Sequence, residues 1–385
     1  MFTPAIRLSV CLLLCAPWLA GFVSAADEAG TGKSAPAGGL VYPNGLALDR
    51  AGNLFISDIG THHILKMDRD GKFSVIAGTG EPGFGGDGGP AAKAQLSAPS
   101  DLLFDGDGNL LVADTFNHRV RRIDASGVIT TLVGDGKSEY STREAAALGV
   151  SLNNPQGIAL DREGNLYIAD TYNHVVRKVD RQGAVTTFAG TEAGLAGDKG
   201  PANKAQLNLP QAVAVGRDGS VYISDGANSR IRRVTPDGMI QTIGGFGPGS
   251  GEGGAGFAGD GGPAEKAKLF SPADLKFSAG GQLYVADSGN NRVRLIAHGV
   301  IMTLAGTGSP GSEGDDGKAL KATLNTPQKV AVAADGALYV ADRVNHKVRK
   351  IDPHGVITTV AGWAGSAGIM VDPAVLPDDS RKHGR

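Results

Sequence analysis

The chain contains only two cysteines, Cys11 and Cys15, and both lie within its first 26 residues. This segment also has one positive charge at Arg7, a mostly apolar run over residues 8–20 and small residues at 23–26. The pattern is that of a secretory signal peptide, because the apolar run is too short for a membrane span. We therefore expect an exported protein, periplasmic or extracellular, whose mature chain has neither a disulfide nor thiolate chemistry.

An uncleaved anchor or a lipoprotein is the alternative interpretation of this segment. A lipid-modified cysteine needs a small residue before it, whereas Val10 precedes Cys11 and Leu14 precedes Cys15. The sequence therefore favours a cleaved signal peptide.

The chain also lacks an excess of charge of either sign. Its formal net charge is −2, and loss of Arg7 with the first 26 residues takes this to −2 − 1 = −3. Proteins that bind nucleic acid or anionic membranes by surface charge are basic, so we expect no nucleic-acid partner. No second apolar run approaches membrane length, so we expect no membrane span in the mature chain.

One motif is present six times. It reads Ala or Ser, Asp, two residues, Asn (Thr61 in the first copy), two residues, Val or Ile, then Arg or Lys (Leu65 in the first copy), and its aspartates are separated by 56, 56, 55, 62 and 55 residues. Such a period with strand-like content is typical of a closed ring of repeats. The aspartates are Asp58, Asp114, Asp170, Asp225, Asp287 and Asp342, and the asparagines are Asn117, Asn173, Asn228, Asn290 and Asn345. We expect both sets to be structural, with each aspartate accepting backbone N–H groups of the turn that follows it.

The third copy shows the repeating unit most clearly. Short strands are predicted at 155–161, 166–170, 175–180 and 184–190, separated by turns that contain Gly or Asn. Six units of four antiparallel strands predict an all-β fold, a six-bladed β-propeller. A linear solenoid, the alternative, needs polar capping repeats, and neither end of the chain shows one.

Gly-rich connectors link the units and end in Leu-x-x-Pro. Three of them contain Gly-Asp-(Gly/Lys)-Gly-Pro-Ala followed by Ala and Lys residues, which predicts one or two helical turns. The fold begins at Leu40 with the end of such a connector and finishes at Trp363 with the start of another, so the first and last blades should abut. The predicted organisation is a signal peptide at 1–26, a flexible linker at 27–39, the propeller at 40–364 and a tail at 365–385.

The Asp-x-x-Asn-His turns at 114–119, 170–175 and 342–347 resemble the NHL repeat, and the connectors resemble those of the teneurin-type NHL group. The resemblance covers Leu40 to Trp363 and implies an NHL-type propeller such as those of exported bacterial NHL-repeat proteins. It does not imply one activity. NHL-type propellers include protein-interaction modules, RNA-binding domains, sensor domains of bacterial kinases and a metal-dependent peptide-amidating lyase.

Four histidines occupy the same place in their repeats: His62, His118, His174 and His346. This place lies between the second and third strands, roughly 10 Å or more from the ring axis at ~4.8 Å per strand. On a six-fold ring, histidines in neighbouring blades are then about as far from one another, which is too far for them to share a metal ion. We expect turn histidines. The adjacent pair His62 and His63 departs from the pattern and is the metal-ligand candidate that the sequence leaves open, with Ca or Zn as the ion.

The residues that follow each strand-opening proline should rim the channel on the connector side. Asp101 and Asp274 are three blades apart and so face each other, and Lys329 is in the blade next to Asp274. Such a rim suits a small polar ligand or a cation, and a hydrated channel mouth is the simpler interpretation. The candidates are Asn44, Ser100, Asp101, Gln156, Gln211, Asp274, Gln328 and Lys329.

The chain shows no nucleophile elbow and no zincin helix, and its connectors and Asn/His turns gather on one face. The sequence therefore favours a non-catalytic binding or scaffold propeller, a monomer without a cofactor. We expect its partner to be a protein, peptide or glycan on the connector face. The alternative is a metal-dependent enzyme, a lyase or lactonase-type hydrolase, acting at the channel mouth.

Overall fold

The computed structural model describes residues 39–140, 145–247 and 256–362. The predicted signal peptide, nearly all of the predicted linker and the predicted tail lie outside the described residues. Within the described part, no helix is long and apolar enough to cross a membrane.

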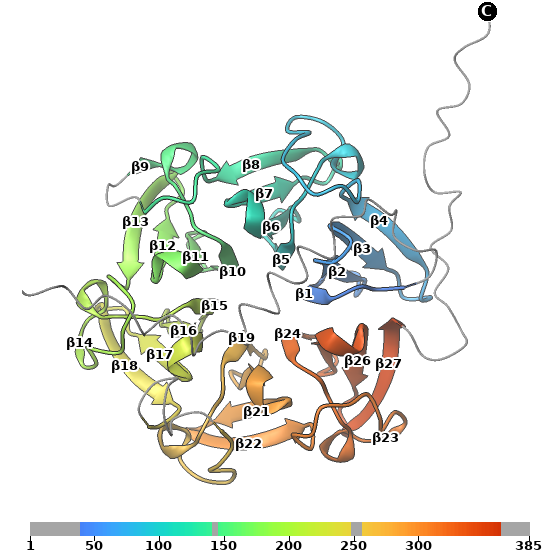
Figure 1. The fold of residues 1–385 in the computed structure, drawn as a ribbon, viewed down its shortest axis with the longest axis vertical. Coiled ribbons are helices and arrows are strands. Elements are labelled where there is room, and N and C mark those ends of the chain that lie inside the picture. Colours follow the sequence, from blue (N-terminus) through green and yellow to red (C-terminus); the bar gives the residue numbers. More distant parts are fainter. Residues whose placement is uncertain (1–38, 141–144, 248–255, 363–385) are drawn as a thin grey trace, which may run out of the picture. The chain divides into compact units, whose positions relative to one another are not determined.

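Six antiparallel sheets form the blades of a ring (Figure 1). In each blade four strands that are consecutive in sequence lie side by side, which confirms the predicted six-bladed propeller. Blade 1 contains β1 (Pro43–Leu48), β2 (Leu54–Asp58), β3 (His63–Met67) and β4 (Phe73–Ala77). Blade 2 contains β5 (Pro99–Phe104), β6 (Leu110–Asp114), β7 (Arg119–Ile123) and β8 (Ile129–Val133). Blade 3 contains β10 (Pro155–Leu160), β11 (Leu166–Asp170), β12 (Val175–Val179) and β13 (Ala184–Ala189).

The second half of the ring repeats this arrangement. Blade 4 contains β15 (Pro210–Val215), β16 (Val221–Asp225), β17 (Arg230–Val234) and β18 (Met239–Gly244). Blade 5 contains β19 (Pro272–Phe277), β20 (Leu283–Asp287), β21 (Arg292–Ala297) and β22 (Val300–Ala305). Blade 6 contains β24 (Pro327–Val332), β25 (Leu338–Asp342), β26 (Lys347–Ile351) and β27 (Val356–Gly362). Single 3-10 turns join the second and third strands of five blades: η2 (Thr115–Asn117), η4 (Thr171–Asn173), η6 (Gly226–Asn228), η8 (Ser288–Asn290) and η10 (Arg343–Asn345).

The hydrophobic core is divided into six clusters, one at each seam between neighbouring blades. At one seam, for example, Val293 of β21 packs in the same cluster as Val330 of β24. Because both faces of a blade are covered in this way, a second strand such as β2 is buried at every position. A single blade cannot bury both of its faces alone, so stability depends on the neighbours on each side.

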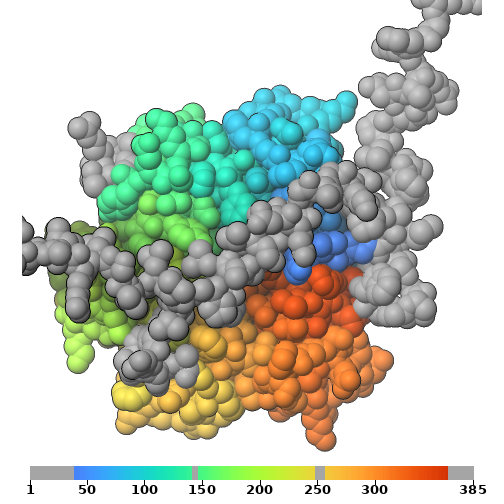
Figure 2. All heavy atoms as spheres, viewed as in Figure 1, coloured from blue at the N-terminus to red at the C-terminus, as the bar shows by residue number. Residues whose placement is uncertain are grey.

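The first and last blades abut, as the sequence predicts. Strand β1 contacts β24 and β25, and Leu46 and Ile56 share a buried cluster with Ala341 and Val348. In Figure 2 the blue atoms of the first blade lie directly against the red atoms of the sixth. The ring is therefore closed by the same apolar packing that joins the other blades.

Each connector in the described part packs between the blade before it and the blade that follows it. Its predicted helical segment is a single 3-10 turn: η1 (Ala91–Lys93), η3 (Ala147–Gly149), η5 (Ala202–Lys204), η7 (Ala264–Lys266) or η9 (Ala319–Lys321). The turn does not extend into an α-helix because its backbone groups are used elsewhere. The Ala91 N–H, for example, donates to the Gly127 carbonyl, and the Ala91 carbonyl accepts the Gly78 N–H.

Beside these turns the connectors add short pairing segments to the outermost strand of the next blade. Three are strands, β9 (Ala145–Ala146), β14 (Gly200–Pro201) and β23 (Gly317–Lys318), which pair with β13, β18 and β27. In blades 2 and 5 the pairing is a single bridge, between Pro90 and Val128 and between Pro263 and Val300. The connector thereby protects a strand edge that would otherwise be exposed.

A buried arginine joins each of four connectors to its blade by side-chain bonds. In blade 4 the Arg232 guanidinium donates to Asp225 Oδ2 at 3.1 Å and to Asp198 Oδ1 in the connector at 2.8 Å, and its side chain is 0% exposed. Asp225 ends the second strand and is one of the six repeat aspartates. The other sets of connector Asp, Arg and repeat Asp are Asp87–Arg121–Asp114, Asp260–Arg294–Asp287 and Asp315–Arg349–Asp342.

We expect Arg232→Met to lower the free energy of unfolding by about 3–5 kcal/mol, because it leaves a buried carboxylate without its counter-charge. The neighbouring Arg233→Met is the matched control. Arg233 and its partner Asp218 have side chains that are 30% and 50% exposed, so that change should cost no more than about 1 kcal/mol. Urea unfolding followed by circular dichroism measures both, and equal losses for the two variants would contradict this role of Arg232.

Candidate functional site

The predicted rim residues lie at the starts of the six innermost strands. In every blade the pairing of this strand with the second strand shifts register directly after the opening proline, so the rim residues sit at a β-bulge. Three of the uncharged candidates are buried, namely Asn44, Ser100 and Gln328. Gln156 and Gln211 are half-buried.

The three charged rim residues form one cluster across the channel. Lys329 Nζ on β24 donates to Asp101 Oδ2 on β5 and to Asp274 Oδ1 on β19, each at 3.2 Å. All three side chains are at most 4% exposed. The sequence placed Lys329 beside Asp274, and the structure adds that its side chain also reaches the aspartate on the far side of the ring.

Each aspartate of this cluster also bonds to the backbone of the next blade. Asp101 Oδ2 accepts the Ile158 N–H at 3.0 Å, and Asp274 Oδ2 accepts the Val330 N–H at 2.9 Å. The carboxylates therefore join blade 2 to blade 3 and blade 5 to blade 6, while Lys329 joins the two pairs. We call Asp101, Asp274 and Lys329 the channel staple.

Burial and charge act in opposite directions on the staple. Burial raises the pKa of Asp101, but the ammonium groups of Lys329 and Lys276 outweigh it and hold that pKa below its ordinary value. Burial keeps the pKa of Asp274 above its ordinary value despite Lys329. Burial lowers the pKa of Lys329, and the two carboxylates more than reverse this. The oxygens that a cation would use are bonded to an ammonium, so a ligand here has to displace Lys329.

The repeat aspartates are buried and hydrogen-bonded, but most bond differently from the prediction. Only Asp58 accepts N–H groups of the turn that follows it, from Gly60 and Thr61. In each of the other five, one oxygen accepts a backbone N–H of the preceding connector, as Asp114 does from Ser97 at 2.8 Å. The second oxygen accepts the amide of the motif asparagine and the buried arginine. Sequence reasoning missed this arginine partner.

The first blade is the exception among the six. Thr61 and Leu65 stand where the other blades have the motif asparagine and the buried arginine. Burial raises the pKa of Asp58 to about 7, although N–H groups from Val41, Gly60 and Thr61 lower it. In blades with the arginine, such as blade 4, burial raises the pKa of the aspartate to about 6. The first blade therefore has a buried carboxylate that titrates near neutral pH.

Three of the turn histidines, His62, His118 and His174, bond to the next connector and not to a common point. The backbone is left-handed at this position, with φ 54° at His118 and 57° at His174. His118 Nδ1 accepts the N–H of Asn154, and His174 Nδ1 accepts the N–H of Leu209, each at 3.2 Å. Ser229 and Asn291 make the same bond with side-chain oxygen in blades 4 and 5. Burial lowers the pKa of each turn histidine. A neutral ring with Nδ1 as acceptor therefore serves as a clamp between blades.

The candidate metal ligands His62 and His63 are buried in the first blade. His62 Nδ1 accepts the Ala98 N–H at 3.1 Å, which leaves Nε2 of His62 and Nδ1 of His63 without a hydrogen-bond partner among the described residues. In the same part of the chain, no three His, Cys, Asp or Glu side chains gather as metal ligands do. The pair thus has no third protein ligand in the described structure.

Half-exposed aromatic residues lie on the connector face, at positions that no repeated sequence motif indicates. Phe84 and Phe257 are 43% and 40% exposed, and the guanidinium groups of Arg119 and Arg292 lie over their rings at 3.7 and 3.6 Å. The glycine before each ring is fixed, because the motif asparagine donates to its carbonyl at 2.6 and 2.7 Å. The phenyl groups of Phe84 and Phe257 are therefore held in place on the same face of the propeller.

We expect Lys329→Met to destabilise the protein by roughly 3–5 kcal/mol at pH 7, since it leaves two buried carboxylates unpaired. Burial raises the pKa of such carboxylates above the unfolded value, so the loss should shrink as the pH falls from 7 towards 4. The triple variant Asp101→Asn, Asp274→Asn, Lys329→Met should recover most of the stability. Urea unfolding at several pH values measures this, and a loss that does not depend on pH would argue against the staple.

The histidine clamps predict a second pH effect. A lowered folded-state pKa means that the contribution of His174 to stability is full above about pH 6.5 and is lost as the pH falls below it. His174→Asn keeps an acceptor that does not titrate, as Asn291 shows in blade 5. Its stability relative to the wild type should therefore rise between pH 7.5 and 5. Ser229→Asn exchanges one acceptor that does not titrate for another at the same position in blade 4, so it should show no such trend, and parallel curves for both variants would refute the clamp.

Two family models match the repeats of this chain. The Teneurin NHL domain model matches residues 138–195, 191–250 and 300–375, and the NHL repeat matches 271–294. The chain is 31% identical over 327 residues to Protein SUPPRESSOR OF QUENCHING 1, chloroplastic, of Arabidopsis thaliana, covering 81% of this chain and 30% of that protein. It is 32% identical over 279 residues to human Teneurin-4, covering 64% of this chain and 10% of that protein. The chain thus spans a minor part of these relatives' length.

Among solved structures, an auxiliary nutrient binding protein from Bacteroides thetaiotaomicron superposes with a TM-score of 0.60. The identity is 15%, over 83% of this chain and 70% of that one, which shows a common fold. The ring has six blades, five of them have the Asp-x-x-Asn turn, and the family models match the repeats. The chain therefore belongs to the NHL-repeat family of β-propellers, with distant homology to the NHL regions of teneurins and of SUPPRESSOR OF QUENCHING 1.

Proposed function

We propose that the protein is an exported, non-catalytic binding or scaffold propeller that recognises a protein, peptide or glycan partner with its connector face. The proposal rests on the distribution of the exposed large apolar side chains, most of which lie on one face. Seven are on connectors or on a turn of the same face: Phe84, Tyr140, Leu148, Phe246, Phe257, Leu320 and Val344. Two others, Met239 and Met302, are on outer strands, and in the described part of the chain none is in a hairpin turn of the opposite face.

The shape of this surface supports recognition by aromatic anchors. Interfaces are enriched in aromatic residues and arginine, and fixed anchors bind well because little conformational entropy is lost. Phe84 with Arg119 and Phe257 with Arg292 form two such platforms, in the connectors that enter blades 2 and 5. These connectors are three blades apart, so a partner that contacts both covers the channel mouth.

No observation on the described residues favours the metal-dependent enzyme that the sequence leaves as the alternative. The two rim carboxylates are bonded to Lys329, and the histidines are spread around the ring as clamps. The fold itself also serves binding in the auxiliary nutrient binding protein of Bacteroides thetaiotaomicron, although fold alone does not decide function.

A benzophenone side chain placed at residue 84 or 257 tests the proposal, because it inserts into C–H bonds of protein or glycan. In the source cells we expect a discrete adduct from both positions. The matched controls are Ala51 and Ser126, exposed turn residues of the opposite face, which should give none. Competition with purified protein should abolish the adduct, but Phe84→Asp/Phe257→Asp protein should not compete. Adducts from both faces alike, or from neither, would exclude the connector face as the binding surface.

A further inference from the structure

One outer strand edge of the ring has no connector beside it in the described part of the chain. In blades 2–6 the fourth strand pairs with a segment of the connector that enters the blade. Strand β4 of blade 1 pairs only with β3 among the described residues, and Figure 1 shows it at the rim of the ring. An unpaired strand edge offers its N–H and carbonyl groups to a further extended segment. The edge of β4 is therefore a candidate binding surface.

Elsewhere each connector is fixed by the alanine that begins its 3-10 turn. The N–H of this alanine donates to a glycine carbonyl in the turn between the third and fourth strands of the blade that follows. Its carbonyl accepts the N–H of the first connector glycine, directly after the fourth strand of the preceding blade. All five described connectors make both bonds, at 2.8–3.1 Å. The alanines are Ala91, Ala147, Ala202, Ala264 and Ala319.

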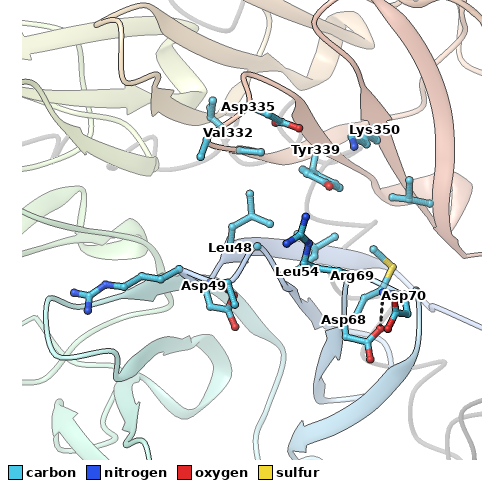
Figure 3. Close-up of a pocket in the computed structure, with 18 of the residues that line it drawn as sticks. Leu48, Asp49, Leu54, Asp68, Arg69, Asp70, Val332, Asp335, Tyr339 and Lys350 are labelled. Atoms are coloured by element: carbon cyan, nitrogen blue, oxygen red, sulfur yellow. Dashed lines mark hydrogen bonds between the residues drawn. The ribbon is translucent and has the colours of Figure 1, made fainter.

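Blade 1 has the same turn glycine. Gly71 has φ 80°, and the corresponding glycines of the other blades have φ of 77–84°. Asp68 Oδ1 fixes this turn by accepting the N–H groups of Asp70 and Lys72 at 3.0 and 2.8 Å. Figure 3 shows Asp68 and Asp70 in the turn, which borders the cavity between the first and sixth blades. No described residue donates to the Gly71 carbonyl, so an incoming N–H group can bond there.

The chain after the sixth blade repeats the spacing of a connector. Gly362 has φ 97°, within the 87–106° of the first glycine of the five connectors. Ala202 follows its first glycine, Gly190, by 12 residues (202 − 190), and Ala374 follows Gly362 by the same 12 (374 − 362). Pro373 precedes Ala374, as proline precedes the alanine in three of the five connectors. Residues 370–374, which we call the edge segment, lie outside the described part of the chain, and this pattern selects them as the occupant of the open edge.

The side chains that the edge segment would meet differ from those of other blades in a matching way. In blades 2, 4, 5 and 6 an aspartate four residues before the connector alanine bonds to the buried arginine. In blades 2 and 6 it also accepts a threonine hydroxyl of the fourth strand. Blade 1 has Leu65 at the arginine position and Val75, directly opposite on β4, at the threonine position. Met370 stands four residues before Ala374. Three apolar residues thus replace a polar set, and one of them belongs to the edge segment.

Two residues near the edge segment depart from most connectors. Ile369 stands where four connectors have a glycine with positive φ, and Pro377 has no N–H to close the 3-10 turn. The connector of blade 3 departs in the same places. It has Thr142 at the glycine position, no described bond closes its turn in this way, and Ala147 still makes both of its bonds. The two alanine bonds therefore do not require either feature.

We propose that the edge segment of this chain binds the open edge of β4 and acts as the connector of the first blade. The Ala374 N–H donates to the Gly71 carbonyl, and the Ala374 carbonyl accepts the N–H of the last glycine of β27. Met370 lies against the two apolar residues that replace arginine and threonine. The chain then crosses from blade 6 to blade 1 as it crosses the other seams, at the one seam where leucine has the place of the buried arginine. This contact does not depend on the partner surface proposed above.

The register of blade 2 identifies the amide that reports this contact. There the Ile129 N–H donates to the carbonyl of Gly89, two residues before Ala91. The same register in blade 1 pairs the Phe73 N–H with the carbonyl of Asp372, two residues before the connector alanine. Hydrogen exchange of the Phe73 amide therefore measures whether the edge segment is bound.

Truncations test the proposal against the full chain. In a chain that ends at Ala367 the Phe73 amide should exchange at least 10-fold faster than in the full chain, because its acceptor is gone. A chain that ends at Leu376 is the matched control and should keep the slow exchange. The Ile129 amide, bonded within blade 2, should exchange alike in all three. Equal exchange of Phe73 in the three chains overturns the proposal. Slow exchange that appears only as protein concentration rises would assign the edge to a second copy and overturn binding within one chain.

Point variants test the fit of the edge segment in a chain of full length. Met370→Asp puts a carboxylate against two apolar side chains and should speed exchange of the Phe73 amide at least 10-fold. Ser380→Asp makes the same change of charge beyond the segment and should have no effect. Adding Leu65→Arg and Val75→Thr to Met370→Asp recreates the set of blade 2 and should restore slow exchange. Unchanged exchange in Met370→Asp, or an equal effect of both aspartates, contradicts the proposal.

Discussion

A guanidinium group without access to water, held between two carboxylates, fixes how four of the connectors meet the next blade. Desolvating the guanidinium and the repeat carboxylate costs several kcal/mol per ion, and their close bonds offset this, while the connector carboxylate stays partly exposed. Arginine suits the task because its planar fork reaches two acceptors in different directions. The arrangement works only if the seam stays dry, so these ion pairs depend on the apolar clusters beside them, and the connector in turn covers the strand edge.

The closing seam departs from this design in several linked ways. Leu65 replaces the arginine, Asp58 is left with N–H donors alone, and His63 stands where other blades have a residue such as Arg119 or Arg292. The channel staple compensates at another place, because it bonds blade 6 to blade 2 across the channel. Ring closure is therefore shared between apolar packing at the seam and charge across the channel.

The fold was predictable because the sequence pattern of each strand occurs six times. The strands of blade 3 match the predicted ranges to within a residue. The buried arginines were harder to recognise, since Arg177 and Lys178 are adjacent basic residues in one strand and differ only in which face they point to. A signal was present, however. Aspartate precedes the arginine by 34 residues in four repeats, a constancy that only direct bonding requires. The reach of Lys329 depends on distances across the ring that no local pattern contains.

The way that connectors bond has a consequence for where this chain can be divided. A connector contributes its aspartate, its 3-10 turn and its edge pairing to the blade that follows it, and the preceding blade bonds to it at the first glycine and through side chains such as His118. The cooperative module thus starts directly after the fourth strand of one blade and ends with the fourth strand of the next blade. Gene duplication, circular permutation or insertion at that boundary keeps every guanidinium with both of its carboxylates. A cut made at the visible start of a blade, before the strand-opening proline, separates them.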